Sequence, residues 1–333
     1  MNESIAGKLV SVTGADGFIG SHLVQLLVEK GAKVRALVYY NSWNEIGWLK
    51  ELPQDILKKV EVFHGDIRDR SRVVEFVQNQ EYVFHLSSLI AIPYSYVAAE
   101  SYVQTNVIGA LNIAEALKNS KSLKRLLHVS TSEVYGTAQY VPIDEKHPLV
   151  GQSPYSASKI AADKMIESYH RSFSLPVVTA RPFNTFGPRQ TSRAVIPTIA
   201  TQLLAKVPIL KLGATTPTRD FNYVTDTADG MLSLALCGAA EGRTVNIGTG
   251  EEWSIAETAK LLMQITGHEV EIVCENERIR PEKSEVNRLL SDNTLITDLT
   301  SWKRQVSFQV GLRNTVDWLT TVKCDNLNTS YMI

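Results

Sequence analysis

Three glycines near the amino terminus restrict the fold of this 333-residue chain more than any other feature. Gly14, Gly17 and Gly20 follow the apolar run Leu9–Val12, and apolar residues then recur at helical spacing. Glycines here let the backbone turn tightly between a strand and a helix, and they let a pyrophosphate approach the free N–H groups of the helix start. The motif therefore predicts a dinucleotide-binding turn on the first strand of an α/β domain.

Short β-rich runs alternate with longer helical patterns over the first half of the chain. Continuous apolar strands separated by helices are typical of a parallel sheet that helices cover on both faces. We therefore predict a Rossmann-type, doubly wound parallel sheet. Its predicted strands are Leu9–Val12, Val34–Val38, Val60–Phe63, Tyr82–Leu86, Leu126–Val129 and Val177–Ala180, and a further strand is predicted at Thr244–Ile247.

The strand–helix rhythm loosens after Arg181, where five prolines break the next segment into short pieces. A capping-box sequence at Ser254–Glu257 then predicts the start of another helix. This pattern indicates a smaller carboxy-terminal lobe beside the sheet. We assign the Rossmann domain to residues 1–182 plus about 219–240, and the smaller lobe to about 183–218 and 241–325.

The second strand lacks the residue that a dinucleotide site usually carries at its end. An acid about 20 residues after the glycines normally binds the adenosine ribose, but here the strand ends in Tyr39 and Tyr40. No arginine follows that would bind a 2′-phosphate, so NAD and NADP both stay open. Asp66, after the third strand, is well placed for the adenine edge, although an ordinary loop or helix-capping aspartate fits the same position.

Tyr155 and Lys159 lie four residues apart in a helix that Ser153 and Pro154 begin, so they share one face. A neighbouring ammonium and a nicotinamide cation would lower the pKa of the tyrosine and favour its phenolate. The phenolate could then take a proton from a sugar hydroxyl while hydride leaves for the cofactor. A tyrosine and a lysine at this spacing are common in helices. The pair indicates a catalytic function only because the same chain also carries the glycine motif.

The segment Ser130–Glu133 directly follows the fifth strand. The carboxyl ends of strands line the ligand crevice of a doubly wound sheet. Thr131 can hydrogen-bond a sugar hydroxyl there, and Glu133 adds a carboxylate. A simple alcohol dehydrogenase does not need that acid, whereas an enzyme that removes a proton next to a ketone does.

With these motifs in order, the chain resembles the extended short-chain dehydrogenases/reductases, the nucleotide-sugar epimerase/dehydratase family, over nearly its whole length. Thr131–Glu133 resembles the 4,6-dehydratases and UDP-glucuronate decarboxylases, since 4-epimerases usually lack the glutamate. Four further segments look most like NDP-N-acetylglucosamine 4,6-dehydratases of the legionaminic-acid type: Tyr40–Asn44, Ile90–Tyr96, Gly151–Tyr155 and Arg181–Gln190.

The resemblance implies a nicotinamide cofactor and a nucleotide-sugar substrate. The implied catalytic residues are Thr131, Ser132, Glu133, Tyr155 and Lys159. The implied cofactor contacts are Gly14, Gly17, Phe18, Ile19, Gly20, Asp66, Ile67, Leu86, Tyr155 and Lys159. For the substrate we expect Asn184 near the sugar–phosphate, and Arg189, Arg219 and Arg280 at the diphosphate and nucleotide, because guanidinium groups match phosphate oxygens.

The implied reaction has three steps on one bound sugar. Tyr155, helped by Lys159 and Thr131, deprotonates the C4 hydroxyl as hydride passes to the nicotinamide. Glu133 removes the C5 proton, water leaves from C6, and the hydride returns to C6. The family's glucose dehydratases carry an aspartate where Ser132 stands, as the acid for the leaving hydroxyl. Here either Ser132 relays a proton through water, or Glu133 both takes and gives it.

Other functions stay open at this point. A UDP-glucuronate decarboxylase shares every catalytic motif, and Arg219 could bind its substrate's carboxylate. A 4-epimerase is disfavoured by Glu133. A catalytically silent NAD-binding regulator would be expected to lose Tyr155, Lys159 or Thr131, and all three are present.

Composition excludes several classes. The net charge of −1 gives no basic surplus for nucleic acid, and no uncharged stretch is long and apolar enough for a membrane span. The three cysteines have no metal spacing and indicate reduced, mostly buried thiols in a reducing compartment. We therefore expect a cytoplasmic protein without a metal, and the resemblance implies a homodimer built on the helices near Tyr102–Leu117 and Tyr155–Tyr169.

Overall fold

The chain folds around a seven-stranded, entirely parallel sheet in the order β11-β6-β5-β4-β1-β2-β3. This computed structural model describes residues 4–278 and 281–321. The predicted doubly wound fold is confirmed, because the chain builds outward from β1 to β3 and then returns to the other side of β1 with β4. The strands are β1 (Leu9–Thr13), β2 (Lys33–Tyr39), β3 (Val60–Gly65), β4 (Tyr82–His85), β5 (Arg125–Val129), β6 (Val177–Pro182) and β11 (Thr244–Ile247).

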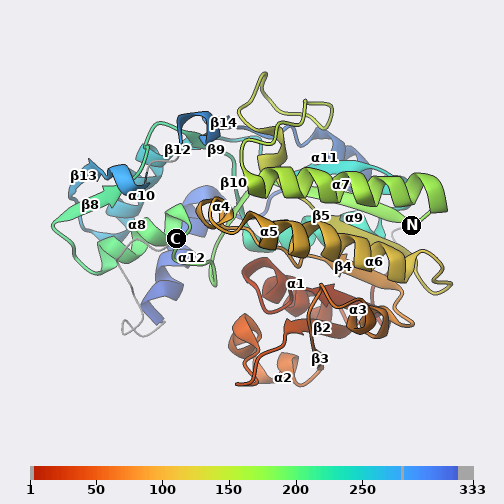
Figure 1. The fold of residues 1–333 in the computed structure, drawn as a ribbon. Helices are drawn as coiled ribbons and strands as arrows, with labels where there is room; N and C mark the ends of the chain where they lie inside the picture. Colours follow the sequence, from red (N-terminus) through yellow and green to blue (C-terminus); the bar gives the residue numbers. More distant parts are fainter. Residues whose placement is uncertain (1–3, 279–280, 322–333) are drawn as a thin grey trace.

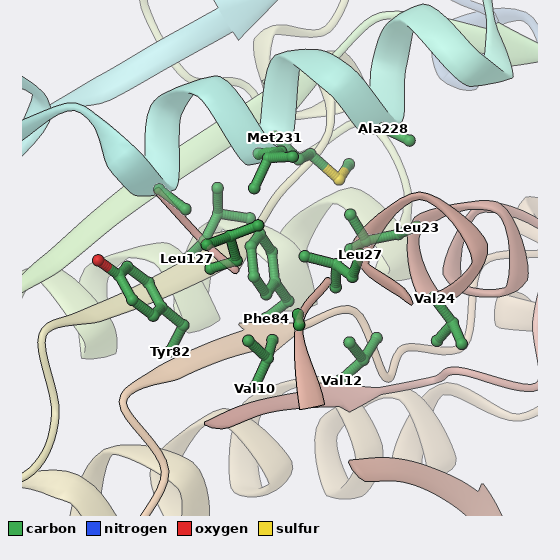
Figure 2. Packing of buried hydrophobic residues seen from close by; sticks show 14 of the residues in the cluster. Val10, Val12, Leu23, Val24, Leu27, Tyr82, Phe84, Leu127, Ala228 and Met231 are labelled. Carbon is green, nitrogen blue, oxygen red and sulfur yellow. The ribbon is translucent and has the colours of Figure 1, made fainter. Parts of the chain in front are cut away.

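Helices cover both faces of this sheet (Figure 1). On one face, α1 (Phe18–Glu29) and α9 (Val224–Leu236) pack against each other and against strands β1, β4 and β5. Figure 2 shows Leu23, Leu27 and Met231 meeting Phe84 and Leu127 in this layer. All five side chains are buried, which removes enough apolar surface from water to hold the two helices on the sheet.

The opposite face carries α3 (Arg70–Val77), α6 (Gly109–Leu117) and α7 (Pro154–Phe173). The predicted helix near Tyr102–Leu117 begins earlier, with α5 (Ala99–Tyr102), and passes through a π-helical segment, η2 (Val103–Ile108), before α6. The buried Asn106 side chain turns inward there and bonds both backbone groups of Leu89. This inward turn accounts for the break in a helix that the pattern predicts as continuous.

A second apolar cluster lies at the side of the sheet (Figure 1). Phe186, Phe221 and Phe308 meet there at centroid distances of 5.3 to 6.1 Å. The Ser254 capping box is confirmed at the start of α10. The elements around this cluster are β7 (Asn184–Phe186), α8 (Val195–Leu204), β8 (Ile209–Leu212), β9 (Thr218–Arg219), β10 (Phe221–Tyr223), β12 (Trp253–Ser254), α10 (Ile255–Thr266), β13 (Glu271–Cys274), β14 (Arg288–Leu289) and α12 (Phe308–Thr321).

The sheet differs from the predicted domain division at one strand. Residues Thr244–Ile247, which the pattern placed in the smaller lobe, form β11 and pair with β6 at the edge of the main sheet. Helix α11 (Thr294–Thr300) packs against β11 and α9. The pairing of β11 with β6 could not be predicted from the sequence pattern. The prolines between β6 and α9 interrupt the strand–helix alternation that would indicate a parallel crossover back to the sheet. We propose that β11 belongs to the Rossmann domain.

The predicted burial of the cysteines is wrong for the two that the structure describes. Cys237 is half-buried and Cys274 is exposed, and both are free thiols. Cys324 lies outside the described residues.

Candidate active site

The carboxyl ends of all seven strands meet at one edge of the sheet, because every pairing is parallel. The glycine motif leaves β1 at this edge, Leu86 leaves β4, Thr131 leaves β5 and Asn184 leaves β6. The chain reverses its strand order between β1 and β4, which is the place where doubly wound sheets bind ligands. The fold thus brings the glycine motif, Leu86, Thr131 and Asn184 to one edge of the sheet.

The glycine loop has the geometry that a pyrophosphate needs. Gly14 has a φ of +64°, and a Cβ on Gly20 would lie 2.0 Å from the Gly14 carbonyl oxygen. A Cβ on Gly17, at the helix N-cap, would meet only that same oxygen, so the face of the helix start beyond it is open backbone. Phe18 and Ile19 form the first turn of α1. The loop therefore has a geometry that fits a dinucleotide.

Thr13 ties the glycine loop to the end of β4. Its hydroxyl oxygen accepts hydrogen bonds from the backbone N–H groups of Leu86 and Ser87, each at 3.0 Å, and also meets Nδ1 of His85 at 2.9 Å. The buried side chain of Thr13 thus fixes the position of Leu86, a predicted cofactor contact, relative to Gly14.

Helix α7 presents Tyr155 and Lys159 to the crevice floor. Ser153 caps the helix, its hydroxyl accepting from the N–H of Ser156, and Pro154 occupies the first turn as predicted. Both predicted catalytic side chains are buried. The Lys159 ammonium donates a 2.7 Å hydrogen bond to the carbonyl of Val129, the last residue of β5. The lysine therefore anchors the catalytic helix to the strand that carries Thr131 and Glu133.

Thr131 caps a short 3₁₀ helix, Ser132–Tyr135, and accepts a 3.2 Å hydrogen bond from the Glu133 N–H. The Thr131 side chain also hydrogen-bonds Tyr155, and the Glu133 carboxylate is close enough to act on the charge of that tyrosine. Thr131 and Glu133 are half-buried, whereas Ser132 is only 2% exposed. The structure thus brings the Glu133 carboxylate together with the side chains of Thr131 and Tyr155.

The predicted lowering of the Tyr155 pKa is not found in the protein alone. Burial raises the pKa of this tyrosine and outweighs the hydrogen bond from Thr131, and Glu133 raises it further. Burial also lowers the pKa of Lys159 to about 8, opposed by Asp163. Desolvation disfavours the charged form of both side chains, and Lys159 points its ammonium at the Val129 carbonyl.

Asp66 follows β3 and pairs with Arg68 through three contacts of 2.6 to 3.0 Å. The guanidinium lowers the pKa of Asp66. Ile67 is buried, and its carbonyl accepts from the Asn112 side chain. These bonds fix the backbone of Asp66 and Ile67 at the adenine end of the crevice, and their contact with a cofactor stays a prediction.

Two predicted substrate residues lie in the segment that joins the sheet to the second cluster. Oδ1 of Asn184, on β7, is buried and has no hydrogen-bond partner among the described residues. Arg219, on β9, is buried, donates to the Thr218 carbonyl and approaches Glu285 at 3.4 Å. An unpaired buried amide oxygen is costly in a protein, so Asn184 fits a residue that meets a ligand.

Arg189 and Arg280 are less informative. Arg189 is buried and reaches back to α1, where it contacts Ser21 at 3.4 Å and Gln25 at 3.2 Å. Its guanidinium contacts the helix that carries the glycine motif, and its role at a diphosphate stays a prediction. Arg280 lies outside the described residues.

Comparison with known proteins agrees with this geometry. The family model described as GDP-mannose 4,6 dehydratase matches residues 12–315. The chain belongs to this family of extended short-chain dehydrogenases/reductases. A dTDP-glucose 4,6-dehydratase of Xanthomonas campestris is 28% identical, and the match spans 93% of this chain and 92% of that protein.

Solved structures of the family superpose on the whole fold. A dTDP-glucose 4,6-dehydratase double mutant of Streptomyces venezuelae, solved with NAD, has a TM-score of 0.85 at 28% identity and covers 94% of this chain and 97% of its own. A UDP-glucuronic acid 4-epimerase of Bacillus cereus, solved with UDP-glucuronic acid and NAD, has a TM-score of 0.83 at 26% identity and covers 94% and 99%. A nucleotide-sugar dehydratase or epimerase is therefore the activity class that membership of this family supports.

Sequence reasoning missed a buried aspartate beneath this family site. Asp163 accepts hydrogen bonds from Ser130 at 2.8 Å and from Arg181 at 2.9 Å, and it contacts His128 at 3.3 Å. These partners and charges lower its pKa to about 2. The signal was available, because Asp163 stands four residues after Lys159 and eight after Tyr155, on the same helix face.

Asn106 is a second missed residue. Besides its bonds to Leu89, it donates a 2.9 Å hydrogen bond to the Ser158 hydroxyl, which in turn donates to the Tyr155 carbonyl. No sequence pattern marks it, since it acts from a π-helical segment that only the structure reveals.

The residues that the structure describes contain neither a metal-ligand cluster nor a membrane-spanning helix. They contain no group of three or more potential ligands that could hold a metal ion. Within the same residues, no helix combines the length and apolar character that crossing a bilayer requires.

Proposed function

We propose that this chain is a nucleotide-sugar 4,6-dehydratase that uses NAD and converts an NDP-N-acetylglucosamine to the NDP-4-keto-6-deoxy sugar. The observation that carries the reaction is the placement of Glu133 beside Tyr155 and Thr131 at the end of β5. Reversible oxidation of an alcohol needs Tyr155, Lys159 and Thr131, and Glu133 adds the base that an elimination needs. The N-acetylated sugar rests on the resemblance of segments such as Tyr40–Asn44.

A bound nicotinamide dinucleotide supplies reversible oxidation at C4, and its ring cation favours the phenolate of Tyr155. Tyr155 takes the proton of the C4 hydroxyl, while Thr131 orients that hydroxyl and Lys159 holds the helix against β5. The C4 ketone makes the C5 proton acidic. Glu133 removes that proton.

The proton for the leaving C6 hydroxyl comes from Glu133 in this proposal. Glu133 is protonated once it has taken the C5 proton, and giving that proton to the hydroxyl releases water and restores the carboxylate. Reduction at C6 then requires a new proton at C5, which Glu133 takes from water and delivers, while Tyr155 returns its own proton to water. The near-complete burial of Ser132 supports this single-acid route over a relay through its hydroxyl. The unpaired Oδ1 of Asn184 and the guanidinium of Arg219 are proposed to bind the sugar–phosphate end.

The test is to incubate the purified protein with UDP-GlcNAc, GDP-GlcNAc, UDP-glucuronate and common NDP-hexoses and to measure product masses. We expect loss of one water from an NDP-N-acetylglucosamine with no net change in the cofactor. Loss of carbon dioxide from UDP-glucuronate would assign a decarboxylase instead. An unchanged mass with inversion at C4 would assign an epimerase, and no turnover of any sugar would leave a silent binder.

Glu133→Gln sharpens this test, because it removes the carboxylate and preserves the size of the side chain. We expect a fall in dehydration of about 10²- to 10⁴-fold, together with loss of deuterium incorporation at C5 in heavy water. Tyr155→Phe is the matched control, since it should block oxidation at C4 in dehydratase and epimerase alike. Full turnover by Glu133→Gln would contradict the proposed elimination.

Two broader expectations accompany this function. A cytoplasmic location and a homodimer built on α5, α6 and α7 both stay predictions. The exposed Val103, in η2 between α5 and α6, and the exposed Phe173, at the end of α7, are consistent with such an interface.

A further inference from the structure

The end of β2 lacks the expected ribose acid in sequence, yet the structure places a carboxylate there. Oδ2 of Asp16, from inside the glycine loop, accepts a 3.3 Å hydrogen bond from the backbone N–H of Tyr39, the last residue of β2. The side chain is partly exposed. Within the part of the chain that the structure describes, no other residue donates a hydrogen bond to Oδ1. An acceptor-only group therefore faces the position where a dinucleotide fold usually reads the adenosine ribose.

The loop after β2 packs onto Asp16 and fixes its backbone. The Trp48 N–H donates a 2.9 Å hydrogen bond to the Asp16 carbonyl. Gly47, with a φ of +55°, lies so close that a Cβ there would fall 2.5 Å from the same oxygen. Asn41 closes the loop, since its Oδ1 accepts from the N–H groups of Trp43 and Glu45. A loop built against one aspartate keeps that carboxylate at the end of β2.

The arginine that interacts with Tyr39, Arg68, is already paired with a carboxylate and does not offer a free site for a 2′-phosphate. Arg68 is close enough to Tyr39 to interact with its side chain, but its guanidinium is paired with Asp66 through three contacts. A carboxylate accepts hydrogen bonds from the two vicinal hydroxyls of a ribose and repels a phosphate on the 2′ oxygen. Because partial burial removes some of the water around the Asp16 carboxylate, hydrogen bonds from the two ribose hydroxyls would stabilise its charge more strongly.

We propose that Asp16 replaces the missing acid of β2, accepting hydrogen bonds from the adenosine ribose hydroxyls and excluding a 2′-phosphate. The residue thereby sets the selectivity of the chain for NAD over NADP. This inference rests on the proposed function only in requiring that the protein bind a dinucleotide, and it does not depend on the sugar or on the reaction.

Calorimetric titration of the nucleotide-free protein tests the inference without any turnover. Wild-type protein should bind NAD more tightly than NADP, and ADP more tightly than 2′-deoxy-ADP. Asp16→Asn keeps the size of the side chain and removes its charge. We expect it to weaken NAD binding by about 10- to 100-fold, the worth of a hydrogen bond to a charged group. The preferences for NAD over NADP and for ADP over 2′-deoxy-ADP should shrink in parallel.

Asn41→Ala is the control for a merely structural effect, because it loosens the same loop and leaves the Asp16 carboxylate in place. It should preserve both preferences. The inference is overturned if Asp16→Asn still distinguishes ADP from 2′-deoxy-ADP, if Asn41→Ala erases the preferences equally, or if wild type binds NADP as well as NAD. Failure of the wild type to bind either dinucleotide would overturn the proposed function as well.

Discussion

Two buried aspartates, Asp163 on helix α7 and Asp220 beside the second cluster, show how the two regions stabilise charge differently. Asp163 meets the cation Arg181 and the ring of His128, and its pKa falls to about 2. Asp220 accepts hydrogen bonds from the neutral donors of Thr249, Gly250 and Ser291, and burial raises its pKa to about 6. Arg304 is close enough to feel the charge of Asp220, but its guanidinium is hydrogen-bonded to Glu251. Similar burial thus gives opposite pKa shifts, because Asp163 is in direct contact with a buried cation and Asp220 is held by neutral donors.

The difference matters for what each region does. Asp163 connects β5, β6 and α7 through Ser130 and Arg181, so it holds together the elements that carry Thr131, Tyr155 and Lys159. Asp220 holds two loop segments, Thr249–Gly250 and the residues around Ser291, by three backbone N–H groups. A charged network lies under the catalytic residues, and a neutral hydrogen-bond clamp organises the loops around β9 and β14.

The largest effect is expected from Asp163→Asn. It strands the buried guanidinium of Arg181 without its counter-charge, and we expect a loss of about 3–5 kcal/mol in the free energy of unfolding, measured by urea denaturation at pH 7. Arg181→Met in the same chain should recover part of this loss, because no unpaired charge then remains. If Asp163→Asn alone were as stable as wild type, the Asp163–Arg181 pair would not make the expected contribution to the free energy of unfolding.

Asp220 should make stability depend on pH in a window where Asp163 does not. Between pH 3.8 and about 6 the native state keeps a proton on Asp220 that the unfolded chain has lost, so stability falls as pH rises, by up to about 3 kcal/mol. The contribution of Asp163 is complete above pH 3.8 and is lost only as pH falls towards about 2.

Urea denaturation of wild type and Asp220→Asn across pH 4 to 7.5 measures this difference. The wild-type advantage over Asp220→Asn should shrink as pH rises, because the amide does not titrate. Asp163→Asn should show no comparable change relative to wild type in the same range. Parallel curves for wild type and Asp220→Asn would contradict the raised pKa of Asp220.

The smallest effect concerns the alkaline limb of activity. Asp163 opposes the desolvation that lowers the pKa of Lys159 to about 8, so Asp163→Asn should move the loss of the ammonium to lower pH by roughly one unit. The pH dependence of kcat/KM for the sugar that is turned over reports this shift. Asp220→Asn should leave the alkaline pKa of kcat/KM at its wild-type value. An unchanged alkaline pKa in Asp163→Asn would contradict the influence of Asp163 on Lys159.

The local sequence pattern was sufficient to predict the strands of the sheet and to select the candidate catalytic residues. The predicted strands of the main sheet are all present, and Tyr155, Thr131 and Glu133 lie together as the motif order indicated. These features could be predicted because each depends on neighbours within a few residues. The pairing of Thr244–Ile247 with β6, on which the proposed assignment of this strand to the Rossmann domain rests, could not be predicted from local pattern, because strand pairing joins segments far apart in sequence.

The sequence by itself determined the parallel sheet, the glycine turn and the residue types for alcohol oxidation, since backbone freedom, periodicity and side-chain chemistry are local properties. Only the tertiary structure decided which charges face one another. It placed Asp16 at the end of β2, put Asp163 under Lys159 and Arg181, and directed Lys159 to the Val129 carbonyl. Burial and long-range pairing set those energies, because desolvation and counter-charge depend on the surroundings that folding creates.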